Sequence, residues 1–559
     1  MNTPVTDRKK QPGIDRRVPL SRTAWGLLAL VALVYLGWFA FMSFTVDGQR
    51  WFVLADDAMI SMRHAYFLAH GQGLVWNPGQ HVEGFTNLGW TLVMAAAHLL
   101  PLPLRLTSLV LQLINLALHL LLTTYVYRFM CPRAGEWPAL GAALLVGLNA
   151  PLLAYGVLGF ETSLQTLLVT VALLRFVPAF TDKQAGNAAV PPGLRWVPLW
   201  CAFAFLVRPD SITLFLTGSI AALWVSAGDW REQRAILGTI AAGLLLMAGV
   251  LAFQKGYYGY WFPNTYYLKA SGDTRQLARG IKYVVKFAVQ EFQFAFLLAP
   301  LAYLFSGLRA KTTRRAFVPA SLILGAWVCY LVWVGGDVFS LSRFWTPIIP
   351  MLAVCTVLGL CRWQAELSHS RTQPRTNAAW QKAGVGVVAA LLGLQLLTGP
   401  LRIHTAVKDN KGGAVEGVLY AAALGRSHLA PGTTIGVFLA GTTPYFMPHV
   451  MFHDFLGKCD THISHSPAHW GPPGHNKWDF AYSLNVVQPR YLITDGDYPT
   501  SDLAGTDATM RQWIRERKDY GFHPSLWLDP LFRRDYVRTS LSIDGAEITG
   551  QQIYVRKSP

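Results

Sequence analysis

The hydrophobic residues of this chain fall into long blocks separated by short polar loops. The first block, 24–46, contains no charged residue and is long enough to cross a hydrocarbon core about 30 Å thick. Comparable blocks predict helical spans at 88–100, 106–127, 138–158, 161–179, 195–207, 210–226, 234–254, 288–305, 316–334, 344–361 and 381–398. The pattern therefore predicts a polytopic α-helical membrane protein.

The hydropathy falls after Thr398. Residues 399–559 mix polar turns with short β-rich runs, which predicts one soluble α/β domain. The clearest of these runs are 434–440, 491–494 and 552–555.

Basic residues predict the orientation. The net charge is +17, and Lys and Arg gather in short loops such as 306–315 and 362–382, which the positive-inside rule places in the cytoplasm. A cytoplasmic tail at 1–23 is expected, followed by a transmembrane domain at 24–398. The domain at 399–559 then lies on the outer, periplasmic side.

The segment 88–100 decides the number of crossings. It is short and is followed by Pro101 and Pro103, so we expect a partial or interfacial helix there. Residues 88–127 then cross once, and the chain makes about eleven net crossings, with about thirteen as the alternative.

Two other interpretations of the composition are not supported. No basic helix or zinc-finger spacing accompanies the positive charge, so nucleic-acid binding is not expected. Five of the six cysteines lie in or beside apolar blocks and only Cys459 lies in a long polar region, so we expect no disulfide framework.

Candidate chemistry begins in the first outside loop, at 47–87. Asp56, as an N-cap, and Asp57 start a predicted helix along the membrane surface, on which Asp57, Ser61 and His64 share one side. Adjacent carboxylates just outside a span fit a general base or a metal ligand, although helix capping alone would also explain them.

Further motifs follow this acidic pair in a fixed order. They are Gly71 to Asn77, Val82-Glu83-Gly84-Phe85-Thr86-Asn87, Gly159-Phe160-Glu161-Thr162, Arg208-Pro209-Asp210, Tyr257-Tyr258-Gly259, Pro263-Asn264-Thr265-Tyr266-Tyr267, Gly335-Gly336-Asp337 with Arg343-Phe344, Asp454-Phe455-Leu456-Gly457 and Pro473-Gly474-His475-Asn476-Lys477. In this order they resemble the GT-C superfamily of membrane glycosyltransferases. The resemblance is strongest to the bacterial group that includes the mycobacterial terminal β-arabinofuranosyltransferase, although Phe160 replaces a leucine of that group.

The resemblance implies a multi-pass protein of the bacterial inner membrane with a GT-C fold. It implies transfer of a sugar, arabinofuranose in the nearest group, from a polyprenyl-phosphate donor to an envelope glycan, a lipid or a pilin-like protein on the periplasmic side. A transporter or flippase of lipid-linked sugars is the alternative, because it would also have many spans and few intramembrane charges.

The site residues follow from this reading. Asp57, or Asp56, is the expected base that deprotonates the acceptor hydroxyl. Lys269 and Arg343 are expected to hold the carrier phosphate, because a departing phosphate needs a fixed positive charge. The other residues expected around the donor phosphate or sugar are Glu83, Glu161, Arg208, Asp337, His475 and Lys477, and Lys458 is a further candidate contact.

Six histidines between 449 and 475 suggest a zinc site at first sight. Beyond the bare pairs His449/His453 and His465/His469, however, the spacing is not that of a helical metal site with a glutamate base. We therefore expect a polar loop facing the site, no certain cofactor, and a divalent cation only as an open alternative.

Overall fold

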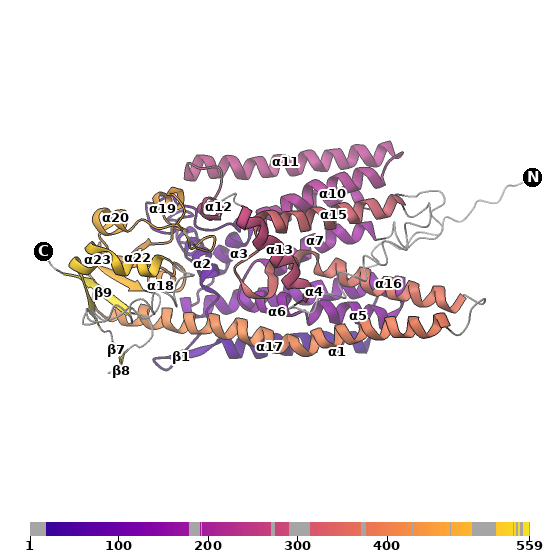
Figure 1. Cartoon of the computed structure of the whole chain (residues 1–559), viewed down its shortest axis with the longest axis horizontal. Coiled ribbons are helices and arrows are strands. Elements are labelled where there is room, and N and C mark those ends of the chain that lie inside the picture. The colour runs from indigo at the N-terminus through magenta and orange to yellow at the C-terminus, as the bar shows by residue number, and fades with distance from the viewer. Residues whose placement is uncertain are drawn as a thin grey trace, which may run out of the picture.

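A computed structural model of the chain describes residues 18–177, 190–191, 193–269, 274–289, 314–369, 376–427, 429–430, 432–469, 471–494, 521–539, 542–543, 546–547 and 552–557. A bundle of long helices makes up most of the molecule, and a small sheet domain lies at one end (Figure 1). The predicted span 288–305 falls almost entirely outside the described residues.

The bundle is built from helices most of which coincide with the apolar blocks. They are α1 (Arg22–Met42), α3 (Leu88–His98), α4 (Leu104–Ala134), α5 (Glu136–Gly147), α6 (Ala150–Val157), α7 (Thr162–Leu173), α9 (Val197–Val207), α10 (Ile212–Val225), α11 (Trp230–Tyr258), α13 (Thr274–Val289), α15 (Arg314–Val334), α16 (Ile349–His369) and α17 (Thr376–Arg426). Short 3₁₀ turns extend several of them, at Leu174–Phe176, Leu194–Trp196, Pro209–Ser211 and Ser340–Ile348. The amphipathic α13 lies outside the apolar blocks, and α17 runs well past its block.

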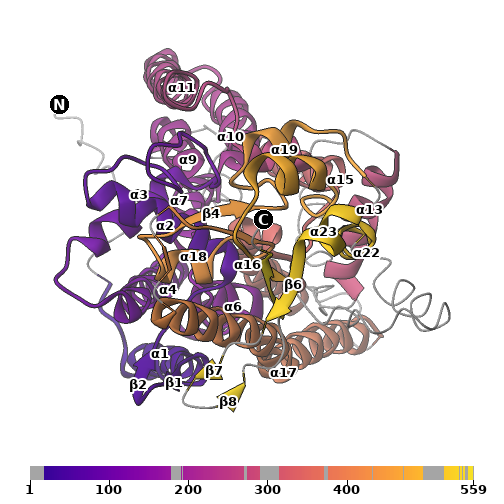
Figure 2. The same ribbon diagram turned by 90° about the vertical axis from the view of Figure 1, so that its left-hand side faces the viewer.

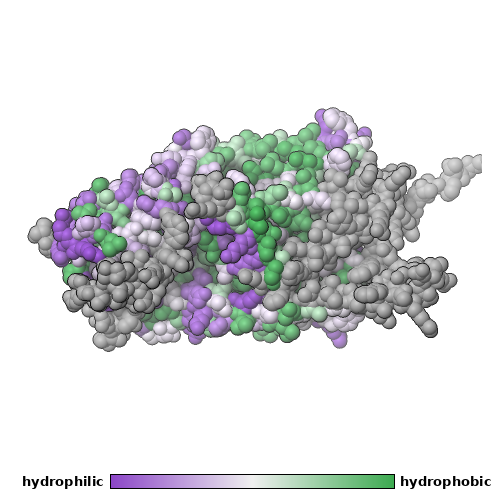
Figure 3. All heavy atoms as spheres, viewed as in Figure 1, coloured by the Kyte–Doolittle hydropathy of each residue, from purple (hydrophilic) through white to green (hydrophobic). Residues whose placement is uncertain are grey.

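Four helical segments in the described part of the chain are long and apolar enough to cross a membrane, namely α1, α4, α11 and Ser340–Cys361. The pair α5 and α6 gives a fifth, bent by 46° where Asn149 caps α6 ahead of Pro151. Hydrophobic residues gather over α11 and the middle of the molecule, whereas hydrophilic ones gather over the sheet domain (Figure 3). Helix α3, at 11 residues, spans only about 17 Å, so by itself it is too short to cross a membrane.

Helix α17 joins the bundle to the sheet domain (Figure 1). The expected domain boundary after Thr398 falls inside this 51-residue helix, so the fall in hydropathy there is not a break in secondary structure. Its last turns carry Ala414 and Val418 into the core under α2 (Asp56–Ala69), and Tyr420 and Leu424 into the core under the sheet. One rigid element therefore contributes to both parts.

The sheet has five strands in the order β4-β3-β5-β9-β6. Their bounds are β3 (Thr434–Val437), β4 (Met451–Asp454), β5 (Tyr491–Thr494), β6 (Tyr536–Thr539) and β9 (Gln552–Arg556). The predicted runs 434–440, 491–494 and 552–555 contain β3, β5 and most of β9, whereas β4 and β6 were not predicted. Strand β3 is parallel to β4 and β5, whereas β9 is antiparallel to β5 and β6. The helices of this domain are α18 (Thr442–Phe446), α19 (Thr461–His465), α20 (Phe480–Tyr482), which a π-helical turn at Ser483–Val487 extends, α22 (Phe522–Leu528) and α23 (Pro530–Asp535).

Two small hairpins complete the described structure. One pairs β1 (Phe44–Val46) with β2 (Gln49–Trp51) directly after α1, and the other pairs β7 (Ser542–Ile543) with β8 (Ala546–Glu547).

The parallel strands decide where the two parts of the molecule meet. Because β3 and β4 run in the same direction, the loops after them leave the sheet at one edge. These loops, 438–441 and 455–459, face α2 in the segment 47–87, and α18 packs beside α2 (Figure 2). The acidic pair at the start of α2 therefore lies at the carboxyl edge of the sheet.

Candidate active site

Asp56 is an anchor of the C-terminal domain and not the N-cap that the sequence predicted. The N-cap is Ala55, without a side-chain cap, and the Asp56 carboxylate accepts hydrogen bonds from the backbone N–H groups of Gly441 at 3.2 Å and Thr442 at 2.8 Å. A side chain at Gly441 would collide with the Asp56 backbone, so this approach requires glycine. Burial raises the pKa of Asp56 to about 6, against the opposing effect of the Thr442 hydrogen bond.

Asp57 is the partly exposed carboxylate of the pair. Its side chain is 32% exposed, and its Oδ1 lies 2.5 Å from Nζ of Lys458. Burial acts to raise the pKa of Asp57, but the charges of Lys458, Lys269 and Arg343 outweigh it and hold that pKa well below its usual range. One ionised carboxylate thus pairs with Lys458 and also feels the charges of Lys269 and Arg343, which come from two other segments.

Lys458 is held by the loop that follows β4. Asp454, the last residue of β4, accepts hydrogen bonds from the N–H groups of Leu456 and Cys459, at 2.9 and 2.8 Å, and Gly457 turns the chain at a φ of 77°. Burial acts to lower the pKa of Lys458, but Asp57 and the neighbouring carboxylates raise it above its usual range. The loop therefore presents a charged ammonium group to α2.

Lys269 and His475 lie side by side next to this pair, and only the lysine of the two is charged. Lys269 ends α12 (Asn264–Lys269), where burial lowers its pKa although Asp337 opposes this effect. A Cβ on Gly474 would lie 3.6 Å from Cε of Lys269, so the turn before His475 runs along the lysine side chain. Burial, with the charge of Lys458, lowers the pKa of His475 to about 4, and its ring is therefore neutral at pH 7.

Lys477 was also predicted at the site, but its amine is held by the backbone of the sheet domain. Its Nζ donates a hydrogen bond to the backbone oxygen of Ser464, at 2.9 Å, so it supports the fold around α19.

Arg343 pairs with Asp337 in a buried setting. Nε of Arg343 lies 2.8 Å from Oδ2 of Asp337, and the guanidinium group lies 4.7 Å from the ring centre of Phe339. Leu341 and Ser342, directly before the arginine, both have positive φ values, of 60° and 47°. Such conformations cost about 1 to 3 kcal/mol each and are retained where the surrounding structure holds them.

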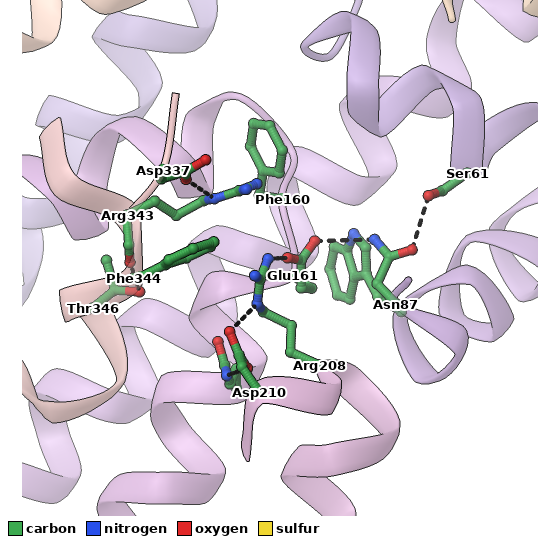
Figure 4. A network of polar contacts seen from close by, with 12 residues as sticks. Ser61, Asn87, Phe160, Glu161, Arg208, Asp210, Asp337, Arg343, Phe344 and Thr346 are labelled. Carbon is green, nitrogen blue, oxygen red and sulfur yellow. Dashed lines mark hydrogen bonds and ion pairs between the residues drawn. The ribbon is translucent and has the colours of Figure 1, made fainter. Parts of the chain in front are cut away.

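A second polar network links α2 to the start of α10 (Figure 4). Ser61 donates to Asn87 at 2.9 Å, Asn87 donates to Glu161 at 3.0 Å, and Arg208 pairs with Glu161 at 2.5 Å and with Asp210 at 3.0 Å. Both carboxylate oxygens of Glu161 are therefore occupied by protein groups, which is typical of a positioning residue.

Phe344 lies between the two arginines of the site. The guanidinium carbons of Arg208 and Arg343 lie 5.0 and 5.4 Å from its ring centre. The expected residues Glu161, Arg208, Asp337 and Arg343 therefore form one connected wall.

Glu83 lies apart from this wall and packs against α11. Its Oε1 accepts a hydrogen bond from Gln254 at 2.8 Å, while its buried Oε2 has no hydrogen-bond partner among the residues that the structure describes. Burial raises the pKa of Glu83 to about 8, so the group is mostly neutral at pH 7.

Arg63 is a residue whose role the sequence analysis missed. Its fully buried guanidinium group donates to backbone oxygens of both parts of the molecule, those of Trp76 at 2.6 Å, Val450 at 2.8 Å and Met447 at 3.3 Å. It thereby fixes α2 against the sheet domain. A charged residue among apolar neighbours on a predicted amphipathic helix was the available signal.

Ser61 and His64, which were predicted to share one side of α2 with Asp57, have structural roles. The His64 ring makes hydrogen bonds to the backbone oxygens of Ile60 and Val82, and burial lowers its pKa to about 4.

The histidine-rich segment shows no metal site. Within the described ranges, no group of three or more His, Cys, Asp or Glu residues is arranged to hold a metal ion. His453 instead bonds to Ser483 at 2.9 Å and approaches Asp460 at 3.5 Å. The surroundings of Asp57 do not fit a divalent cation either, because the ammonium group of Lys458 already pairs with that carboxylate.

Comparison with known proteins gives two kinds of similarity, although no family model matches the chain. The terminal β-(1→2)-arabinofuranosyltransferase of Mycobacterium tuberculosis is 28% identical over 275 residues, which are 47% of this chain and 40% of that protein. The Corynebacterium glutamicum protein of the same name is 29% identical over 276 residues, 44% of this chain and 36% of that protein. This chain resembles the terminal arabinofuranosyltransferases. The match spans less than half the length of each relative.

The second similarity is to a solved structure. ArnT from Cupriavidus metallidurans, bound to undecaprenyl phosphate, superposes with a TM-score of 0.53 at 14% identity, over 96% of this chain and 98% of ArnT. The two chains therefore share a fold over nearly their whole lengths. Together the comparisons confirm the resemblance inferred from the motifs and the helical membrane fold that it implied.

Proposed function

We propose that the chain is a glycosyltransferase that moves a sugar from a polyprenyl-phosphate donor to an acceptor hydroxyl. The observation that carries this proposal is the setting of Asp57, an ionised, partly exposed carboxylate among Lys458, Lys269 and Arg343. A base and several fixed cations in one place suit a reaction that removes a proton and releases a phosphate.

The reaction can be written with these residues. Asp57 accepts the proton of the acceptor hydroxyl, whose oxygen attacks the anomeric carbon of the donor sugar. The bond between that carbon and the phosphate oxygen breaks, and the carrier phosphate leaves with the electron pair. Lys269 and Arg343 stabilise the developing negative charge.

Lys458 links the two halves of this reaction. While it pairs with Asp57, it keeps the pKa of that carboxylate low and the group a weak base. A phosphate bound among the three cations would compete for the lysine and restore basicity to Asp57. In this mechanism the donor must bind before the acceptor is deprotonated.

The similarity to terminal arabinofuranosyltransferases supports arabinofuranose as the sugar and an envelope glycan as the acceptor, with a lipid or a pilin-like protein as alternatives. We place the reaction on the periplasmic side of the bacterial inner membrane, with the N-terminus in the cytoplasm, about eleven crossings and the C-terminal domain outside. The same similarity does not favour a transporter or flippase.

The test is transfer from synthetic polyprenyl-phosphate arabinofuranose by the purified protein, with variants of the acidic pair. Asp57→Asn keeps the size of the side chain but removes its basicity, so turnover should fall by about a hundred- to ten-thousand-fold. Asp56→Asn should mainly lower thermal stability, because the side chain anchors Gly441 and Thr442. Near wild-type turnover in both variants, each correctly folded, would show that neither Asp56 nor Asp57 is the catalytic base.

A further inference from the structure

A cleft of about 440 Å³ opens between the helical bundle and the sheet domain, beside α19. Tyr260, from the turn between α11 and α12, lines it together with His462, His465, Ser466 and Asp479 of the sheet domain. Its volume lies in the range of about 300 to 1,000 Å³ that is typical of small-molecule sites. The reaction written above uses none of these residues.

The cleft adjoins the cationic cluster through α12. The ring of Tyr267 lies 4.2 Å from that of His465, which in turn lies 4.5 Å from the ring of Tyr260. Lys269 is two positions after Tyr267, so the two side chains leave this short helix on different sides. One side of α12 thus borders the cleft, and the other carries Lys269, whose side chain runs along the turn at Gly474 and whose charge lowers the pKa of Asp57.

The lining is suited to an uncharged ligand with many hydroxyl groups. Tyr260 is 39% exposed and offers one aromatic face to the C–H groups of a sugar ring. Oδ2 of Asp479 accepts a hydrogen bond from His462 at 2.8 Å and Oδ1 accepts one from the N–H of Tyr482 at 2.9 Å, which leaves further lone pairs on both oxygens for hydroxyl donors. The carboxylate disfavours an anionic ligand.

We infer that this cleft binds the sugar units that precede the acceptor hydroxyl, so that the acceptor is a glycan several units long. The inference rests on the proposed function. The acceptor end would reach Asp57, while the neighbouring units lie against Tyr260 and Asp479 on the far side of α12.

The test is a binding titration of the full-length protein, without donor, using synthetic arabinofuranosyl disaccharide and hexasaccharide. Wild type should bind the hexasaccharide at least about tenfold more tightly than the disaccharide, a difference of about 1.4 kcal/mol. Tyr260→Ala should remove this difference and leave disaccharide and undecaprenyl phosphate binding unchanged. Ser466→Trp is the second variant, for use if Tyr260→Ala folds poorly. It fills the cleft without removing a lining side chain, and it should also abolish the preference for the hexasaccharide.

Tyr266→Ala is the matched control, since Tyr266 is 44% exposed on the same segment but does not line the cleft. It should behave as wild type. Equal affinity for both sugars in wild type, an equal loss in the two tyrosine variants, or a change only in binding to lipid vesicles would overturn the inference. If the protein binds the longer glycan more tightly but transfers no sugar, the proposed reaction is refuted and the glycan-binding role of the cleft is retained.

Discussion

Nζ of Lys458 lies 2.5 Å from Oδ1 of Asp57, although 401 positions separate the two residues along the chain. The pair joins the carboxyl edge of the sheet to the start of α2. In the proposed mechanism the lysine also binds the carrier phosphate, so that donor binding changes the state of the base.

Replacing Lys458 by methionine should change the pH dependence of transfer. The lysine lowers the pKa of Asp57, so without it that pKa rises and the acidic limb of the kcat/KM profile moves to higher pH. Undecaprenyl phosphate should also bind about tenfold or more weakly, as expected for the loss of one charge-assisted hydrogen bond. The measurement is kcat/KM between pH 4.5 and 8, with phosphate binding in parallel.

Lys477→Met serves as the control for this prediction. Lys477 belongs to the same domain, but its amine bonds to the backbone of Ser464, so its loss should leave the pH profile in place. An unmoved profile in a folded Lys458→Met protein would contradict the coupling.

Glu83→Gln should make the protein more stable at alkaline pH. The pKa of Glu83 is raised from its model-peptide value near 4.5 to about 8, so the folded state holds a proton that the unfolded state has lost over this range. The stabilisation is complete below about pH 4.5 and is lost as the pH rises through about 8. Glutamine carries no such proton. The melting temperature of the Glu83→Gln variant should therefore exceed that of wild type by several degrees at pH 8.5, with a smaller difference at pH 5. An equal difference in melting temperature at both pH values would refute the claim that Glu83 is buried in its neutral form.

Arg208→Leu should destabilise the helical bundle. The arginine neutralises Glu161 and Asp210, and its removal leaves buried carboxylates unpaired, at a typical cost of about 3 to 5 kcal/mol. Adding Glu161→Gln should recover part of that loss, because it removes one of the stranded charges. Unfolding in detergent measures both effects, and an unimproved double variant would show that the pairing contributes little.

The orientation can be tested with reporter fusions. An enzyme that is active only in the periplasm should be active when fused after Pro559 and inactive when fused after Arg375, since the positive-inside rule keeps the basic loop in the cytoplasm. The reverse pattern would place Asp57 inside the cell and refute a periplasmic reaction.

The sequence by itself determined most helices of the bundle and three strands of the sheet, β3, β5 and β9, and it singled out the acidic pair as the candidate base. Hydropathy and propensity are local properties, so an apolar block such as 234–254 is enough to predict the helix that contains it, here α11. The same reasoning could not show that α17 runs on through Thr398, because a helix that leaves an apolar environment keeps its backbone hydrogen bonds.

Only the tertiary structure divided the roles of the two aspartates. Adjacent side chains on a helix point about 100° apart, so the partners of Asp56 and Asp57 depend on what docks against each face. Gly441 and Thr442 meet one carboxylate, and Lys458 meets the other. These contacts come from loops that the parallel pairing of β3 and β4 brings to one edge, and such long-range pairing leaves no periodic signal in the sequence.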